Sequence, residues 1–151
     1  IKNFLVQIGG ENLAKGVNEK GELWKIGLFY LADSLGSKAQ GVVALCDQAI
    51  STAGNFEEFY TRDSLKLAFQ LDSRIGYPVT NGLLSATVVS SDAKTADALA
   101  DALLVMGWRQ AIQLDSTRSD LQMILIYNEK GGNMTQYVSP ELGQFLSFPV
   151  K

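Results

Sequence analysis

The chain has 151 residues, of which 46% are apolar and 19% are charged, and this composition is typical of a globular domain. It carries 13 basic and 16 acidic residues, a net charge of −3, with no cluster of Lys or Arg, so nucleic acid is not expected as a partner. Because the chain contains no histidine, Ser-His and Cys-His catalysis and His-ligated metal sites are excluded. Any site must use carboxylates, hydroxyls, lysines and backbone groups.

The N-terminal half is predicted to consist of strands and hairpin turns. Alternating or β-branched apolar residues indicate four strands: Asn3–Ile8, Asn12–Lys15, Leu23–Leu31 and Gly41–Cys46. Gly9-Gly10 is expected to turn the first hairpin, and Ala32–Gln40 is expected to be a loop of small and polar residues. A further hairpin is predicted around Thr61–Ser64, between Phe56–Tyr60 and Lys66–Leu71.

The stretch from Ala68 to Gly107 contains three predicted elements. Gln70–Val79 is rich in turn residues, and Leu83–Ser90 is an apolar, β-branched run that predicts a strand. Lys94–Met106 is rich in Ala and Leu, follows possible caps and ends at Gly107, which predicts a helix. Its core-facing stripe is expected to comprise these residues: Leu99, Leu103 and Met106, with Ala98, Ala102 and Val105 beside them.

The C-terminal part predicts a short helix at Trp108–Leu114 and a final hairpin. The strands of that hairpin are Met123–Tyr127 and Gln136–Val138, and Gly131-Gly132 supplies the turn. Pro140–Lys151 suggests only a short helical turn. Hairpins outnumber crossovers, so we predict one α+β domain over residues 1–151, with one or two helices packed on a largely antiparallel or mixed sheet.

Two carboxylates of the predicted helix form the first chemical signal. Asp97 and Asp101 are four residues apart and therefore lie on one helix face, where two like charges oppose the helix by roughly 0.2–0.5 kcal/mol. A hard cation such as Mg²⁺ between them would turn this repulsion into ligation. The alternative is that both carboxylates simply face water, as many acidic helix pairs do.

Five segments, in order along the chain, resemble the ApbE family of flavin transferases. They are FLVQIGGENLAKG (Phe4–Gly16), WKIGL (Trp24–Leu28), ISTAGNF (Ile50–Phe56), the Asp72–Val79 turn with its Gly-Tyr-Pro-Val, and the strand–helix unit ending at Gly107. The resemblance covers nearly the whole chain and corresponds to the C-terminal half of the family. It implies half of a two-part, T-fold-like architecture with a ligand cleft between the halves.

The resemblance implies an FAD:protein FMN transferase, which uses FAD and Mg²⁺ to attach FMN to a Thr or Ser of a target flavoprotein. It implies Asp97 and Asp101 as metal ligands and a flavin bordered by the Leu71–Gly76 turn. Glu11 occupies the place of a family acidic residue. The expected binding residues are therefore Leu71, Asp72, Gly76 and Glu11, and no catalytic residue is assigned.

Some positions depart from the family pattern. The family's His falls in the Leu67–Phe69 neighbourhood, its Pro is Ser73 and its Thr is Ile75, while Asp101 stands where many members have Thr. These departures favour an alternative: a non-catalytic flavin-binding or interaction module of the same fold. The chain begins at Ile1, which predicts a processed product or fragment, so an upstream half or a second chain is an expected partner. A periplasmic or envelope-anchored (lipoprotein) location is expected from the family alone.

Overall fold

A six-stranded sheet forms the centre of the fold in the computed structural model, which describes residues 1–30, 38–54, 59–62, 65–68, 70–118, 120–129 and 134–147. All its neighbouring strands pair antiparallel. In spatial order the strands are β1 (Phe4–Ile8), β2 (Glu11–Lys15), β5 (Gln48–Gly54), β10 (Leu83–Ser90), β11 (Gln122–Asn128) and β12 (Met134–Val138). The predicted α+β class with a largely antiparallel sheet is confirmed.

The two central strands, β10 and β11, are buried on both faces of this sheet. Successive strand residues point to opposite faces, so Val88 and Val89 enter two different hydrophobic clusters, and Met123 and Ile124 do the same. All four side chains are at most 2% exposed. These strands contain continuous apolar runs instead of alternating apolar and polar residues, because both of their faces are buried.

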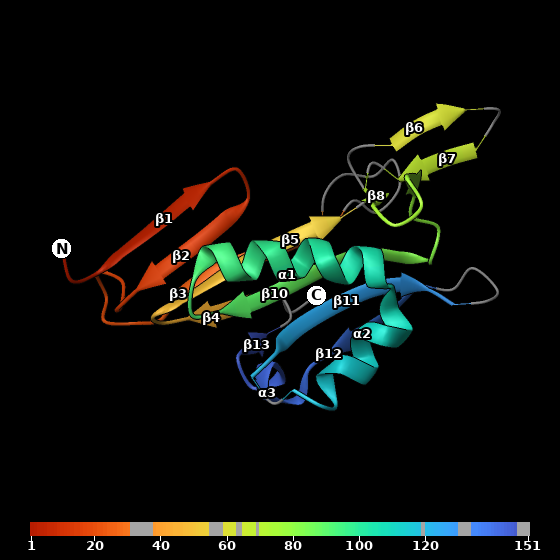
Figure 1. The fold of residues 1–151 in the computed structure, drawn as a ribbon. Coiled ribbons are helices and arrows are strands. Elements are labelled where there is room, and N and C mark those ends of the chain that lie inside the picture. The colour runs from red at the N-terminus through yellow and green to blue at the C-terminus, as the bar shows by residue number, and fades with distance from the viewer. Residues whose placement is uncertain are drawn as a thin grey trace.

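Helices α1 (Ala93–Met106) and α2 (Trp108–Asp115) cover one face of the sheet (Figure 1). The Asp92 side chain caps α1 by accepting the Thr95 backbone N–H at 2.9 Å. Between the two helices the chain turns at Gly107, whose φ of 86° favours glycine. Both predicted helices are confirmed.

The face of α1 that is buried differs in part from the predicted stripe. Leu103 is buried, but Ala98 and Ala102 are exposed. The fully buried positions are Ala96, Ala100, Leu103 and Leu104. Small side chains at Ala96 and Ala100 allow the helix to lie close against β5 and β10, while Leu103 and Leu104 are buried beside them and Leu99 and Met106 pack partly buried against the same core.

The opposite face of the central sheet is covered by a second sheet, β13 (Leu146–Ser147), β4 (Lys38–Leu45) and β3 (Trp24–Tyr30), and by the short helix α3 (Pro140–Gly143). Strand β4 begins at Lys38, so the end of the predicted 32–40 loop is wrong; residues 32–37 lie outside the described residues. Strand β13 was not predicted, because its two residues are strand only through pairing with Val42 and Val43.

Two small hairpins complete the fold. β6 (Phe59–Arg62) and β7 (Leu65–Ala68) form the hairpin predicted around Thr61–Ser64, with residues 63–64 and 55–58 outside the described residues. Figure 1 shows this hairpin projecting beyond the end of β5. β8 (Leu71–Asp72) and β9 (Tyr77–Pro78) form the second hairpin inside the predicted turn-rich segment.

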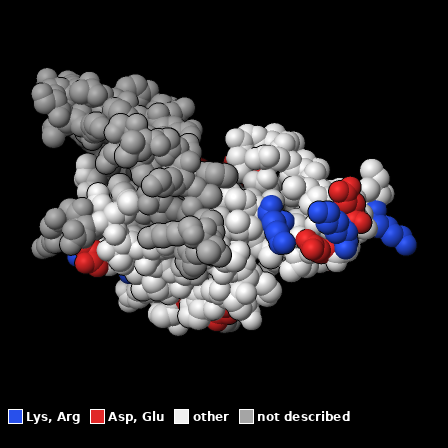
Figure 2. All heavy atoms as spheres, turned by 180° about the vertical axis from the view of Figure 1, so that it is seen from behind, with Lys and Arg blue, Asp and Glu red and all other residues white. Residues whose placement is uncertain are grey.

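Charged side chains gather at one end of the second-sheet face (Figure 2). Lys15 at the end of β2 pairs with Asp47, between β4 and β5, at 2.9 Å, and Lys25 on β3 pairs with Glu22, which precedes β3, at 3.4 Å. Because all four side chains are more than half exposed, these pairs add little to stability. Among the described helices, none has the length and apolar character needed to cross a membrane.

A buried polar network fixes α2 to the C-terminal strands. The Asp115 carboxylate accepts hydrogen bonds from Tyr137 Oη at 2.6 Å and from Ser139 Oγ at 2.8 Å. Ser139, which is fully buried, also accepts the Met123 backbone N–H at 2.9 Å. Burial and the Asp115 carboxylate together raise the pKa of Tyr137 to about 12, so the phenol stays protonated and donates at any physiological pH.

Ser139→Ala is expected to lower the free energy of unfolding by roughly 1–3 kcal/mol, because it leaves the Met123 N–H buried without an acceptor. Urea unfolding followed by circular dichroism measures this change. The control is Ser91→Ala, which alters an exposed serine outside the network. Equal midpoints for the two variants would contradict the structural role given to Ser139.

Candidate functional site

Asp97 and Asp101 lie at the margin of the face with which α1 contacts the sheet. Each follows a buried alanine, Ala96 or Ala100, by one residue and is therefore turned about 100° around the helix from the buried face. Both carboxylates are exposed enough to reach solvent or a ligand. The predicted pair thus exists on one helix face, beside the strands rather than on the far side of the helix.

Each of these carboxylates has a polar partner from another element. Ser51 Oγ, from β5, donates to Asp97 Oδ1 at 3.4 Å, which is long for an O–H···O hydrogen bond. Gln70 Nε2, from the residue before β8, donates to Asp101 Oδ1 at 2.5 Å. The two aspartates are therefore oriented by segments distant in sequence.

The electrostatics favour a cation at this position. Burial raises the pKa of the Asp101 carboxyl, the Asp97 charge raises it further, the Gln70 hydrogen bond lowers it, and the Glu11 charge on β2 raises it. Glu11 is therefore close enough to act on Asp101. A bound cation would offset this accumulation of negative charge.

The residues present fit Mg²⁺, which commonly takes one or two protein carboxylates and completes its octahedron with water and phosphate oxygens. In the described parts of the chain, no group of three or more Asp, Glu, Cys or His side chains could hold a metal ion. Asp97 and Asp101 could therefore supply two ligands, and the remaining ligands would have to come from backbone carbonyls, water and a phosphate-bearing substrate.

The β8–β9 hairpin is held in shape by Asp72. Its carboxylate accepts the Arg74 backbone N–H at 3.0 Å and a two-pronged contact from the Arg74 guanidinium, at 2.9 Å and 2.6 Å. Its carbonyl accepts the backbone N–H of Ile75 and of Gly76, and Gly76 has a φ of 68°. The Asp72 carboxylate thus maintains the turn, and Gly76 permits its backbone conformation.

A cavity of about 420 Å³ opens between this hairpin and α1. Among the described residues, its lining comprises Gln70, Leu71, Asp101, Ala102 and Val105, and so includes Leu71, predicted to border a flavin, and Asp101, predicted to bind a metal. Leu71 is 58% exposed. The structure therefore brings two of the predicted site residues, Leu71 and Asp101, to one cavity, with Asp97 on the same helix face as Asp101. Asp72 and Gly76 lie farther along the hairpin and do not line the cavity.

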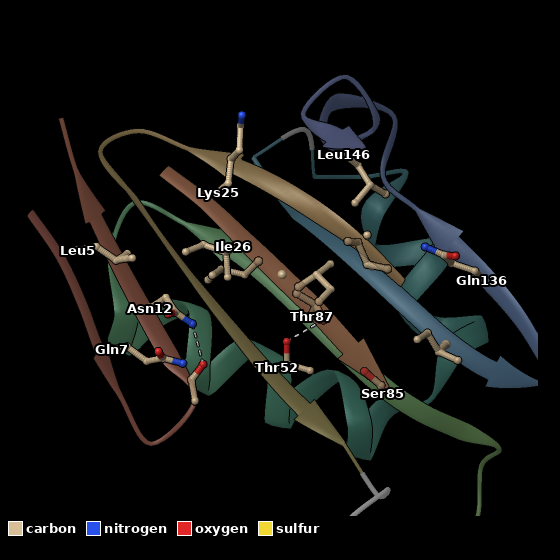
Figure 3. A pocket seen from close by; sticks show the side chains of 17 residues that line it. Leu5, Gln7, Asn12, Lys25, Ile26, Thr52, Ser85, Thr87, Gln136 and Leu146 are labelled. Carbon is tan, nitrogen blue, oxygen red and sulfur yellow. Dashed lines mark hydrogen bonds between the residues drawn. The ribbon is translucent and has the colours of Figure 1, made fainter. Parts of the chain in front are cut away.

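A second cavity of about 410 Å³ lies between the two sheets (Figure 3). Among the described residues, the polar lining is uncharged except for Lys25, and the hydroxyls of Thr52 and Thr87 form a hydrogen bond of 2.8 Å. Aliphatic side chains such as Ile26 and Leu146 form other parts of the wall. None of the six predicted site residues lines it, whereas Leu71 and Asp101 line the cavity beside α1.

Sequence reasoning missed Gln70 and Ser51. Ser51 interrupts the apolar run of β5 on the face that meets α1, opposite Val88, and this polar interruption could have identified it. Nothing in the sequence around Gln70 marks it in the same way, because its contact with Asp101 forms only when the chain folds back onto α1.

Arg74→Ala is expected to raise the pKa of Asp72 from about 2 toward the ordinary 3.8, chiefly because the Arg74 side-chain hydrogen bonds are lost. In the wild type the folded-state pKa lies below the unfolded value. The stabilisation from Asp72 is therefore present above about pH 4 and is lost as the pH falls toward 2.

Carbon-13 NMR of the carboxyl groups measures the midpoint of the Asp72 titration. Arg118→Ala, which breaks the similar Asp120 pair, should leave Asp72 unchanged, and an unchanged Asp72 midpoint in Arg74→Ala would refute the assignment.

Comparison with known proteins identifies relatives over the whole chain. The profile of the ApbE family matches residues 1–125. The FAD:protein FMN transferase of Vibrio cholerae is 29% identical over 147 residues, which cover 97% of this chain and 43% of that protein. The corresponding protein of Escherichia coli K12 is 28% identical over 97% of this chain and 41% of its own length.

A solved structure also matches this fold. The flavin transferase ApbE from Vibrio cholerae superposes with a TM-score of 0.79 at 28% identity, over 95% of this chain and 44% of that one. The chain thus spans less than half the length of these relatives. A family profile that matches residues 1–125 of 151, together with the shared fold, shows that the chain belongs to the ApbE family.

Proposed function

We propose that this chain is part of an FAD:protein FMN transferase, which moves FMN from FAD onto a Thr or Ser hydroxyl of a target flavoprotein. The proposal is carried by one observation: Asp101, which shares a helix face with Asp97, lines a cavity together with Leu71. Relatives that match 97% of the chain bear the name of this activity.

In the proposed reaction, the acceptor oxygen attacks the FMN-side phosphorus of FAD. A new P–O bond forms, the P–O bond to AMP breaks, AMP leaves with the bonding electrons, and the hydroxyl loses its proton. A bound Mg²⁺ supplies charge neutralisation and a template for the pyrophosphate. If water replaces the acceptor hydroxyl, FAD is hydrolysed to FMN and AMP.

Asp97 and Asp101 hold the cation in this proposal, and Glu11 contributes to the negative field without a ligand role. The Leu71–Gly76 turn positions the flavin portion of FAD, with Leu71 in contact and Asp72 holding the turn. The strong charge-assisted contact between Asp72 and Arg74 supports this positioning role, because it restricts the hairpin before any ligand arrives.

The alternative, a non-catalytic flavin-binding module, is favoured by two residues of the hairpin. Ser73 stands in place of the family's Pro and Ile75 in place of its Thr, and Ile75 is 66% exposed, so it presents an alkyl group instead of a hydroxyl. The position of the family's His falls at residues 67–69. Of these, residue 69 lies outside the described residues, as do the side chains of 67 and 68.

Calorimetric titration with FAD, with and without Mg²⁺, tests the proposed site. The wild type is expected to bind FAD more tightly with Mg²⁺, and Asp97→Asn and Asp101→Asn are expected to lose most of that Mg²⁺ dependence, because each removes an anionic ligand. The matched control is Asp120→Asn, which neutralises an exposed aspartate on the α2–β11 connection and should behave as the wild type. FAD binding that ignores both Mg²⁺ and Asp97 would disprove the cation site.

Release of AMP from FAD separates the transferase from the binding module. Incubation of the chain with FAD and Mg²⁺, followed by chromatography, is expected to show AMP in the wild type and much less in Asp97→Asn. Mg²⁺-dependent binding of FAD without AMP release, even when a Thr-containing acceptor protein is supplied, would favour the non-catalytic module.

A further inference from the structure

We propose that Gln70 is a positioning residue that orients the Asp101 carboxylate for a divalent cation and joins that carboxylate to the β8–β9 hairpin. This inference rests on the proposed function, since it concerns the same cation site. It assigns a role to a residue that neither the sequence motifs nor the family resemblance singled out.

The side chain of Gln70 makes a directed contact with the cation site. An ionised carboxylate can only accept hydrogen bonds, so the part of the Gln70 amide that faces Asp101 must be its NH₂ group. In this orientation Gln70 Nε2 donates to Asp101 Oδ1 over 2.5 Å, which is shorter than an ordinary N–H···O hydrogen bond. Asp97 has no equivalent contact, because its hydrogen bond from Ser51 spans 3.4 Å.

The backbone of Gln70 closes the base of the hairpin. Its carbonyl accepts the Val79 N–H at 3.0 Å, just outside the paired residues of β8 and β9. Val79 is buried, so this end of the hairpin is anchored. A single residue thus contacts α1 through its side chain and holds the hairpin through its main chain.

This double attachment has a consequence for the cation. The Gln70 amide occupies one lone pair of Asp101 Oδ1 and restricts rotation of the carboxylate, while Oδ2 stays available as a ligand. Hydrogen bonds to the ligands of a metal typically change metal affinity 10–100-fold when they are removed. Gln70 also lines the cavity together with Leu71 and Asp101, so it fixes the distance between the cation site and the surface proposed to meet the flavin.

Two substitutions of nearly the same shape distinguish positioning from a general structural role. Gln70→Met keeps the side-chain length and removes the donor. Gln70→Glu keeps the shape, removes the donor and places a third carboxylate beside Asp101, where it can ligate the metal directly. Loss of packing alone would affect Mn²⁺ binding by the two variants in the same direction.

The experiment uses Mn²⁺ alone as the probe, with this chain labelled with nitrogen-15. Paramagnetic broadening of backbone amide signals near Asp101 reports weak binding, and its concentration dependence yields the apparent dissociation constant. Gln70→Met is expected to weaken Mn²⁺ binding about 10-fold or more, and Gln70→Glu is expected to bind at least as tightly as the wild type. Ser51→Ala should stay within about threefold, because its longer contact orients Asp97 only weakly. Thermal melts in EDTA confirm that each variant is folded.

The possible outcomes test the role of Gln70 and the cation site separately. Mn²⁺ binding that is lost in Asp101→Asn but equal in Gln70→Met and the wild type overturns the role of Gln70 and leaves the cation site intact. Equal weakening in folded Gln70→Met and Gln70→Glu also overturns it. No broadening near Asp101 in the wild type overturns the cation site of the proposed function and, with it, this inference.

Discussion

Strands β10 and β11 carry apolar side chains on both faces, so both faces of the central sheet have to be covered. Helices α1 and α2 cover one face, and the β13-β4-β3 sheet covers the other. Burial of these strands is worth far more than any surface contact of the molecule, since each fully buried aliphatic side chain contributes roughly 1.5–3 kcal/mol. The position of α1, and therefore of its two carboxylates, follows from this requirement.

The small residues at the α1–sheet contact have a direct effect on the candidate site. Because Ala96 and Ala100 face the sheet, the next residues along the helix, Asp97 and Asp101, lie at the edge of the contact, where they remain exposed. There they meet Ser51, Gln70 and the field of Glu11. Like-charged groups held together against their mutual repulsion are a common feature of functional sites. This arrangement supports the proposed cation site more directly than spacing in the sequence does.

The β8–β9 hairpin beside this site forms a defined turn, although Ser73 stands where the family has proline. A proline would restrict φ at the position of Ser73. In this chain the Asp72 carboxylate, the Arg74 guanidinium and the positive φ of Gly76 together define the turn. At the exposed tip, Ile75, which is 66% exposed, presents an alkyl group where the family has Thr. The shape of the turn is therefore retained while its surface chemistry has changed.

Most of the fold could be predicted from local signals. Gly9-Gly10, the apolar run of β10 and the helix ending at Gly107 were each recognisable, because turn residues, β-branched runs and helix caps act over a few positions. Three points show where this fails. Strand β5 was not among the predicted strands, and strand β13 exists only through its partner in β4. On α1 the fully buried residues include Ala96, Ala100 and Leu104 beside the predicted Leu103.

The same distinction between local patterns and long-range contacts applies to the candidate site. Local patterns in the sequence indicate most of the elements, the i,i+4 pairing of Asp97 with Asp101 and the turn that contains Leu71. Which side chains surround those carboxylates depends on the tertiary structure. The partners of Asp101 and Asp97 lie 31 and 46 residues away along the chain. Periodicity and spacing describe neighbours within one element, whereas a contact across such distances depends on the packing of several elements at once.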